Sequence, residues 1–448
     1  MSGIPEKSPL CGPDYFILAM DHHMRQSGLP GNLCRLVVHL NQYPDLPKVR
    51  KHLQSDPVFN WLSRIRLKRG LPLFLINHYK HVKASGSELI HEENSGDSDD
   101  NWVHTGSKEL LLRRRPGICF EIYRQADGTT RLELVWHHVL MDAIGAEYLL
   151  KRLALDEPSE AAEDLFGSSG PPRRRSICKY LKQFPMDFLS CRQAARYIAS
   201  KSLPPIHLAV RQPSLDTRLA TRHLLIKFEG ETFHRIQQHC QHCGAQLRKG
   251  MFYLAATCMA IKKLGARIKA KDGALVISVP IDRRRVGARS PMFQNHISFQ
   301  FFRIEPQQNV SLKDCLQHLQ QQTVAQVKEN VLGSCSSMMK TFCGVPISLY
   351  SRIIRGPSEG KLSSFSYAYT GTGLQDLTQL FDCDVFGTHH QAPLTWPPGL
   401  AIVFSAHKQK LTCSVSYLEN GWLDEDCEFF KEELKHQLTR EDQSWNSC

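Results

Sequence analysis

The chain has 448 residues, of which 42% are hydrophobic and 22% charged, with a formal net charge of +12. This length suffices for about two or three hydrophobic cores, and no run reaches the roughly 20 apolar residues that span a bilayer. The positive charge leaves anionic partners open: phosphorylated cofactors, acidic carrier proteins, nucleic acid or an anionic membrane surface. The 15 cysteines lack framework spacing and the polar N-terminus lacks signal-peptide features, so we expect a reduced, cytoplasmic protein.

Residues 1–165 predict an α/β unit. Apolar periodicity indicates a strand, a helix, a hairpin and a second helix, in chain order at 33–40, 45–55, 118–138 and 143–153. The hairpin is the clearest of these elements, because two alternating runs flank an Asp127-Gly128 turn. The acidic, serine-rich stretch 86–100 predicts a flexible insertion.

A connector and a second α/β unit are predicted after this. Residues 166–215 combine a Gly/Ser/Pro-rich linker that carries an arginine triplet with a basic helical stretch. Residues 216–448 then repeat the alternation of strands and helices. The expected strands are 223–228, 276–280, 297–302, 364–373, 399–407 and 411–417, and the expected helices are 231–243, 251–264, 312–329 and 423–438.

Two adjacent histidines end the hairpin, and an aspartate follows them where the next helix begins. Alternation along 130–138 places His138 at the end of an apolar face. A strand that stops abruptly at a helix start holds such a side chain rigidly, and a neutral imidazole near pH 7 suits a general base. We interpret His138 as that base and Asp142, which is placed to cap the helix, as its structural partner.

The segment His137-His138-Val139-Leu140-Met141-Asp142-Ala143 resembles the HHxxxDG motif of the chloramphenicol acetyltransferase-like superfamily. That superfamily includes peptide-synthetase condensation domains, wax ester synthases and alcohol acyltransferases. Further landmarks follow in the family's order. Val279 to Arg284 resembles its "PVDLR" segment, Gln294-Asn295 falls where Gly-Asn is frequent, and Phe365 to Gly373 occupies the place of a late conserved segment. The chain departs from the pattern in having Ala143 and Gln294 for glycines and no asparagine in the late segment.

The resemblance implies an α/β fold in which two chloramphenicol acetyltransferase-like sandwich domains, 1–165 and 216–448, form a pseudo-dimer around an interdomain tunnel. A thioester donor would enter from one face and the acceptor from the other, with His138 Nε2 taking the acceptor's proton and no covalent enzyme intermediate. Asp142 would pair with Arg284 as a structural ion pair, and His137 would be a structural neighbour. The candidates for lining the tunnel are Ala143, Gly145, Asn295, Ser366, Thr370 and Gly371.

Other eye-catching motifs have structural interpretations. The segment 239–243 contains two cysteines and two histidines, but its cysteines continue a helical apolar stripe, so we expect core packing and no metal site. The arginine triplets at 113–115 and 173–175 predict solvated surface or a docking patch for coenzyme A phosphates or an acidic carrier protein. No nucleic-acid-binding module surrounds them, so no nucleic-acid partner is expected.

The sequence therefore predicts a thioester-dependent acyltransferase acting on a hydroxyl or amine acceptor. Acyl-coenzyme A is the expected donor, with phosphopantetheine on a carrier protein as the alternative and no tightly bound cofactor. Two other functions stay open: a stand-alone condensation enzyme that uses a carrier-bound donor, and a catalytically silent binding member of the family. We expect a monomer, and the basic surface leaves peripheral membrane contact open.

Overall fold

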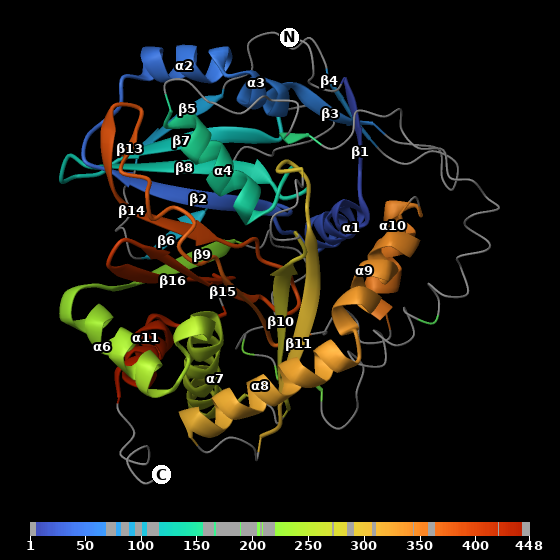
Figure 1. Cartoon of the computed structure of the whole chain (residues 1–448), viewed down its shortest axis with the longest axis vertical. Helices are drawn as coiled ribbons and strands as arrows, with labels where there is room; N and C mark the ends of the chain where they lie inside the picture. The colour runs from blue at the N-terminus through green and yellow to red at the C-terminus, as the bar shows by residue number, and fades with distance from the viewer. Residues whose placement is uncertain are drawn as a thin grey trace.

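Two large β-sheets and the helices packed on them make up the described part of the chain (Figure 1). The computed structural model describes residues 6–68, 78–81, 89–94, 101–104, 116–155, 165–166, 189, 204–206, 208, 220–270, 273–284, 291–306, 311–343, 345–356, 363–419 and 421–440. The alternation of strands and helices agrees with the α/β class predicted from the sequence.

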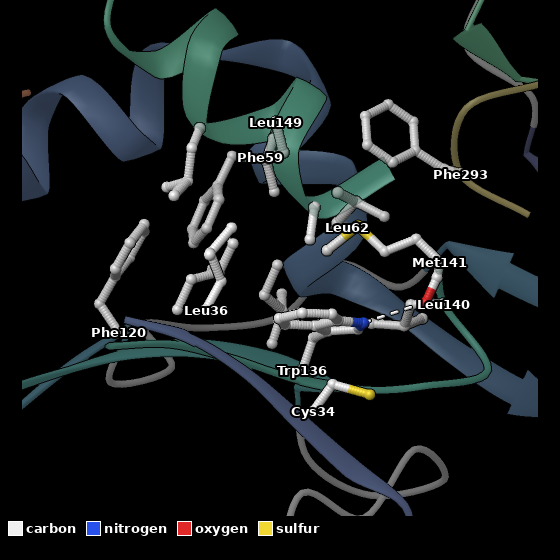
Figure 2. Packing of buried hydrophobic residues seen from close by; sticks show 14 of the residues in the cluster. Cys34, Leu36, Phe59, Leu62, Phe120, Trp136, Leu140, Met141, Leu149 and Phe293 are labelled. Atoms are coloured by element: carbon white, nitrogen blue, oxygen red, sulfur yellow. Dashed lines mark hydrogen bonds between the residues drawn. The ribbon is translucent and has the colours of Figure 1, made fainter. Parts of the chain in front are cut away.

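The first sheet carries the histidine motif. Its strand order is β13 (Gln379–Leu380), β14 (Cys383–Gln391), β2 (Leu33–Leu40), β8 (Thr130–His137), β7 (Ile118–Arg124) and β5 (Ile90–Asn94). The helices α2 (Leu46–Ser55), α3 (Pro57–Arg64) and α4 (Ala143–Leu153) cover one face of it (Figure 1). Alternate residues of β2 and β8 point into this core, where Leu36 and Trp136 pack with Phe59 and Leu149 (Figure 2).

The second sheet has seven strands, with one face on a separate hydrophobic core. Its order is β11 (Ile297–Ile304), β10 (Leu275–Asp282), β12 (Phe365–Tyr369), β15 (Leu400–His407), β16 (Lys410–Leu418), β9 (Thr221–Phe228) and β6 (Asn101–His104). The apolar strand positions pack with α6 (Gly230–His242), α7 (Lys249–Arg267), α8 (Leu312–Lys328) and α11 (Asp424–Thr439). Small and polar residues such as Ala401 and Ser405 alternate with Ile402 and Phe404, so the opposite face of the sheet is more polar.

A third group of elements lies beside both sheets. A small sheet joins β1 (Lys7–Pro9), β4 (His78–His81) and β3 (Ile65–Lys68). The helix α1 (Gly12–Gln26) follows β1 and contacts α9 (Val331–Thr341) and α10 (Ile347–Arg355), and a short 3₁₀ turn, Gln246–Arg248, precedes α7. The N-terminal helix is thus packed against helices that come more than 300 residues later in the chain.

The two halves of the sequence exchange strands. β14, from the second half, pairs antiparallel with β2 of the first sheet, and β6, from the first half, pairs with β9 and forms one edge of the second sheet. β14 also contacts β15 and β16, so it lies between the two sheets (Figure 1). Each sheet is therefore completed by residues from the other half. The division into 1–165, 166–215 and 216–448 remains a prediction about the course of the chain.

Most of the expected elements are confirmed, and one is wrong. The strand at 33–40, the hairpin and the helix at 143–153 have the expected bounds within two residues. The stretch 86–100 is not simply a flexible insertion, because Ile90–Asn94 forms β5 and pairs in parallel with β7. The arginine triplets at 113–115 and 173–175 and most of the connector at 166–215 lie outside the described residues. None of the helices in the described ranges has the length and apolar composition needed to cross a membrane.

Candidate active site

His138 lies in a tight turn between β8 and α4, fixed from several sides. Its backbone N–H donates to the carbonyl of Asn32 at 2.9 Å, and its own carbonyl accepts from the Asn295 side-chain amide at 2.8 Å. The indole of Trp136 donates to the carbonyl of Met141 at 3.0 Å, which ties the end of the same turn to the first core (Figure 2). The backbone around His138 is thus held by hydrogen bonds on both sides of the residue.

The environment of the His138 ring favours its neutral form. Burial lowers the pKa of His138 below its ordinary value, and this effect outweighs the opposing influence of its own carbonyl and of Asp142. Its Nδ1 atom is enclosed and has no hydrogen-bond partner among the described residues. Because Nδ1 is enclosed, Nε2 is the ring nitrogen that can face a substrate. A neutral imidazole with an accessible nitrogen can accept a proton.

His137 is a buried neighbour that is held in one tautomer. Its Nδ1 accepts the backbone N–H of Val139 at 3.3 Å, and its Nε2 lies 3.2 Å from a carboxylate oxygen of Asp21. Since Nδ1 accepts, the proton of the neutral ring is on Nε2 and points to the carboxylate. Burial raises the pKa of Asp21, but His137, Arg25 and a backbone donor outweigh it and hold that pKa well below its usual range.

Asp142 and Arg284 form a bidentate ion pair. Arg284 Nη1 lies 2.8 Å from Asp142 Oδ2, and Nη2 lies 3.1 Å from Oδ1. The same carboxylate accepts the backbone N–H of Gly145 at 3.1 Å, which caps α4, and that of His296 at 3.2 Å. Side-chain exposures of 8% and 10% place the pair almost fully inside the protein. Four hydrogen bonds therefore join the carboxylate to the start of α4, to Arg284 and to His296.

Three of the candidate tunnel residues lie around the turn. Ala143 is the first residue of α4. Gly145 is a close packing position, because a Cβ there would lie 2.6 Å from the carbonyl oxygen of Met292. Asn295 is only 1% exposed, and its side-chain amide also donates to the carbonyl of Val139 at 3.2 Å. These contacts show that the Asn295 side chain stabilises the turn and is not exposed as a wall of an open tunnel.

The other three candidates lie on the second sheet. The hydroxyl of Ser366 lies 3.2 Å from that of Ser278, and Thr370 Oγ1 donates to Ser405 Oγ at 3.1 Å. Gly371 has a φ of +74° and lies two residues after the end of β12, and its carbonyl accepts from the backbone of Ala406 at 3.1 Å. Ser366 and Thr370 share the sheet face opposite Phe365, which packs in the second core. The Ser278–Ser366 pair has one hydroxyl proton left to donate to a substrate, whereas the proton of Thr370 is donated to Ser405.

The sequence did not single out two carboxylates beneath the turn. Asp14 of α1 accepts from the Asn295 side-chain amide at 2.9 Å and from the backbone of Cys11 at 2.8 Å. Burial raises the pKa of Asp14 to about 6, against the effect of these donors. The second carboxylate is Asp21, about two helical turns further along the same face of α1. Nothing in the local pattern of α1 links either aspartate to a motif more than 100 residues away.

The segment 239–243 is structural, as predicted. Cys240 and Cys243 are buried in the second core beside Ile236, and His239 Nδ1 lies 3.0 Å from the carbonyl of Leu438 at the end of α11. These contacts connect α6 with α11, in agreement with the core packing expected for the two cysteines.

Comparison with known proteins gives a match in structure but not in sequence. No protein-family model matches the chain, and no curated protein matches its sequence. The first condensation domain of the CDA synthetase superimposes with a TM-score of 0.64 at 13% identity, covering 97% of this chain and 96% of that domain. Trichothecene 15-O-acetyltransferase from Fusarium sporotrichioides also gives 0.64, at 12% identity, with 97% and 95% covered.

A third similar structure contains bound ligands. It is a variant of the starter condensation domain of rhizomide synthetase in complex with C8-CoA and Leu-SNAC, with a TM-score of 0.62 at 13% identity, covering 99% of this chain and 97% of that one. All three matches extend over nearly the whole chain. The protein therefore has the fold of condensation domains and of this acetyltransferase, two chloramphenicol acetyltransferase-like α/β lobes, as the histidine motif predicted.

Proposed function

We propose that the protein is a thioester-dependent acyltransferase in which His138 is the general base. The observation that carries this proposal is the half-buried His138 at the end of β8, kept neutral by burial and fixed by Asn32, Asn295 and the Asp142–Arg284 pair. The shared two-lobed fold supports it, since the similar structures include an acetyltransferase and a condensation domain in complex with an acyl-coenzyme A.

The reaction needs one proton acceptor and no covalent enzyme intermediate. His138 Nε2 takes the proton of the acceptor's hydroxyl or amine while the acceptor oxygen or nitrogen attacks the thioester carbonyl. The resulting tetrahedral oxyanion is stabilised by hydrogen-bond donors, for which the hydroxyl of Ser366 on the second sheet is our candidate. The intermediate then collapses, the carbon–sulfur bond breaks, and the thiolate takes the proton back from the imidazolium. The histidine ends the cycle neutral.

Asp142 and Arg284 have a scaffolding role in this proposal. Both oxygens of the Asp142 carboxylate accept hydrogen bonds, and the donors are Arg284, Gly145 and His296. His138 is not among these donors. The aspartate therefore differs from the orienting aspartate of a Ser-His-Asp triad, which binds the catalytic imidazole directly. His137 likewise supports the turn through Val139 and Asp21.

Acyl-coenzyme A is the donor that we propose, with the protein acting as a cytoplasmic monomer. The net charge of +12 favours a donor that carries phosphates. Phosphopantetheine on an acidic carrier protein offers the same thioester and similar charge, and the number of condensation domains among the similar structures favours this second candidate.

Release of free thiol from a panel of acyl-coenzyme A donors, with mixed alcohol and amine acceptors, tests the proposal. We expect acceptor-dependent release that falls by about 10²- to 10⁴-fold in His138→Ala, the usual effect of removing a general base. His436→Ala is the matched control, because the side chain of His436 is 44% exposed on α11, where its Nδ1 lies 3.7 Å from Glu433. The control should keep the wild-type rate.

The same assay separates the alternatives. Release only from acyl-phosphopantetheinyl carrier protein would identify a stand-alone condensation enzyme. Absence of release from both donor types, in a protein whose circular dichroism shows a folded state, would contradict an enzymatic function and leave the catalytically silent binding member. Equal rates for wild type and His138→Ala would remove His138 from the mechanism.

A further inference from the structure

Helix α1 carries two aspartates whose hydrogen bonds lead to the histidine turn. Asp14 and Asp21 are seven residues apart, which is about two turns of an α-helix and roughly 10 Å along its axis. Asp14 is 2% exposed, and the side chain of Asp21 is 14% exposed. The start of the helix is closely packed, because a Cβ at Gly12 would lie 2.8 Å from the backbone nitrogen of Lys340 in α9. The two carboxylates are therefore held at fixed positions on one face of α1.

The first aspartate leads to the carbonyl of His138. Asp14 Oδ1 accepts the side-chain amide of Asn295 at 2.9 Å and its backbone N–H at 3.3 Å. The same side-chain amide donates to the carbonyl of His138 at 2.8 Å. Because an ionised carboxylate only accepts hydrogen bonds, Asp14 selects the orientation of the amide in which its nitrogen faces His138.

The second aspartate leads to the backbone N–H of His138. Asp21 Oδ1 accepts the backbone N–H of Asn32 at 2.8 Å, and the carbonyl of Asn32 accepts the backbone N–H of His138 at 2.9 Å. The same oxygen of Asp21 lies 3.2 Å from His137 Nε2. Gly31, with a φ of +105°, permits this approach, because a Cβ there would lie 2.5 Å from Asp21 Oδ1. The loop before β2 thus connects Asp21 with His138.

We propose that Asp14 and Asp21 are positioning residues, and that α1 holds the general base His138 from both sides through two asparagines. The inference rests on the acyl transfer proposed above, because it assigns the residues that keep His138 Nε2 aligned with the acceptor. A displacement of about 1 Å can cost roughly 10²-fold in rate. Loss of either path should therefore lower kcat, whereas KM should change little, since both carboxylates act through other residues.

Steady-state kinetics of thiol release tests the two carboxylates. We expect Asp14→Ala and Asp21→Ala each to lower kcat by about 10- to 100-fold, with KM within about twofold of the wild-type value. The asparagine variants should recover most of that rate, since an amide oxygen can replace Oδ1 and keep the bond to Asn295 or Asn32. A purely stabilising role does not predict this recovery. Asp14→Asn still loses the acceptor of a capping N–H, and Asp21→Asn still loses its ion pair on α1.

Asp426→Ala is the matched control for Asp14→Ala. Each aspartate is the third residue of its helix and nearly buried. Each also accepts the backbone N–H of the residue before the helix, Cys11 at 2.8 Å and Leu423 at 3.1 Å. Asp426 belongs to α11, which packs in the second core. Both alanine variants should lose stability, but only Asp14→Ala should lose kcat at a temperature where circular dichroism shows both to be folded.

A double variant identifies the path from Asp14. If Asp14 acts through Asn295, Asp14→Ala should cause no further loss of kcat when Asn295→Ala is already present. The losses in Asp14→Ala and Asp21→Ala should instead multiply, because the two aspartates act through different asparagines. An undiminished loss from Asp14→Ala in the Asn295→Ala background would contradict the proposed path.

The ¹⁵N resonances of His138 give a measurement that does not depend on acyl transfer. In protein labelled with [¹⁵N]histidine, the signals missing from His138→Ala identify this residue. They should shift in Asp14→Ala and Asp21→Ala and stay in place in Asp426→Ala. These shifts without thiol release from the wild type would refute the acyl transfer but support the holding of His138 by α1. Wild-type kcat and unchanged His138 signals in both alanine variants of α1 would overturn the inference and leave the proposed function intact.

Discussion

The contacts of the Asp142–Arg284 pair allow a quantitative prediction of how its removal changes the free energy of unfolding and the activity. Asp142→Ala removes the partner of a guanidinium that is 10% exposed, together with the cap of α4. Breaking a buried pair on one side costs about 3–5 kcal/mol, and loss of a helix cap adds about 1 kcal/mol, partly in the same bonds. We therefore expect the free energy of unfolding to fall by about 3–5 kcal/mol in Asp142→Ala. Asp142→Asn should lose about half as much, because an amide oxygen can still accept from Gly145.

A double-mutant cycle measures the pair itself. Arg284→Met leaves Asp142 with the backbone donors of Gly145 and His296, so its cost should be smaller, about 1.5–3 kcal/mol. The double variant should be more stable than the sum of the single variants predicts, by at least about 1 kcal/mol, because neither charge is left buried alone. Urea denaturation followed by tryptophan fluorescence gives all four free energies.

Activity measured on the same variants decides the role of Asp142. Replacement of a scaffold residue should reduce the rate of thiol release together with the stability of the fold. Under conditions where the variant is folded, this reduction in rate should be smaller than that caused by His138→Ala. If Asp142→Ala kept wild-type stability but lost activity as completely as His138→Ala, the carboxylate would take part in the chemistry. A coupling energy near zero would show that the ion pair does not act as a unit.

Three further predictions follow from other contacts. Because burial lowers the pKa of His138, its proton-accepting form persists in mildly acidic solution, and the acid limb of the pH–rate profile for thiol release should lie below pH 6.5; a limb above that value would contradict the assignment. The pKa of Asp14 is raised to about 6, so the folded state binds more protons than the unfolded state between about pH 4 and 6. The stability due to Asp14 is therefore present at low pH and is lost as the pH rises through this window. Denaturation curves should show that loss in wild type and not in Asp14→Asn, and parallel curves would refute it. Gly373→Ala should lower the free energy of unfolding by about 1–3 kcal/mol, because its Cβ would collide with Glu147, which bonds His390 at 2.9 Å; unchanged thermal denaturation would contradict this packing argument.

Local patterns predicted the elements around the histidine motif well. The turn Asp127-Gly128 fixed the hairpin, and Asp142 was placed correctly as the cap of α4, because both signals depend on neighbouring residues. The pairing of Asp142 with Arg284, residues 142 positions apart, was implied only by resemblance to a family. The bidentate geometry agrees with that expectation.

Other contacts could not be inferred because they join distant segments. β14 was not among the strands predicted from the sequence, and nothing in its residues indicates that it pairs with β2 of the first sheet. β5 was missed because its acidic residues suggest a solvated insertion, although Ile90 is buried against β7. Asp14 and Asp21 resemble surface residues of a helix until the helix is packed against the histidine turn. All three sets of contacts depend on tertiary packing, which the periodicity of the sequence does not indicate.

The strand exchange has a consequence for biosynthesis. When a ribosome has made the first 165 residues, β2 still lacks its partner β14, which is synthesised more than 200 residues later. Until then β2 is an open sheet edge, rich in valine and leucine, that can pair with other nascent chains. Completion of the first sheet therefore waits for almost the whole polypeptide, and we expect the isolated N-terminal half to aggregate, with a separate peptide of residues 379–391 able to reduce that aggregation.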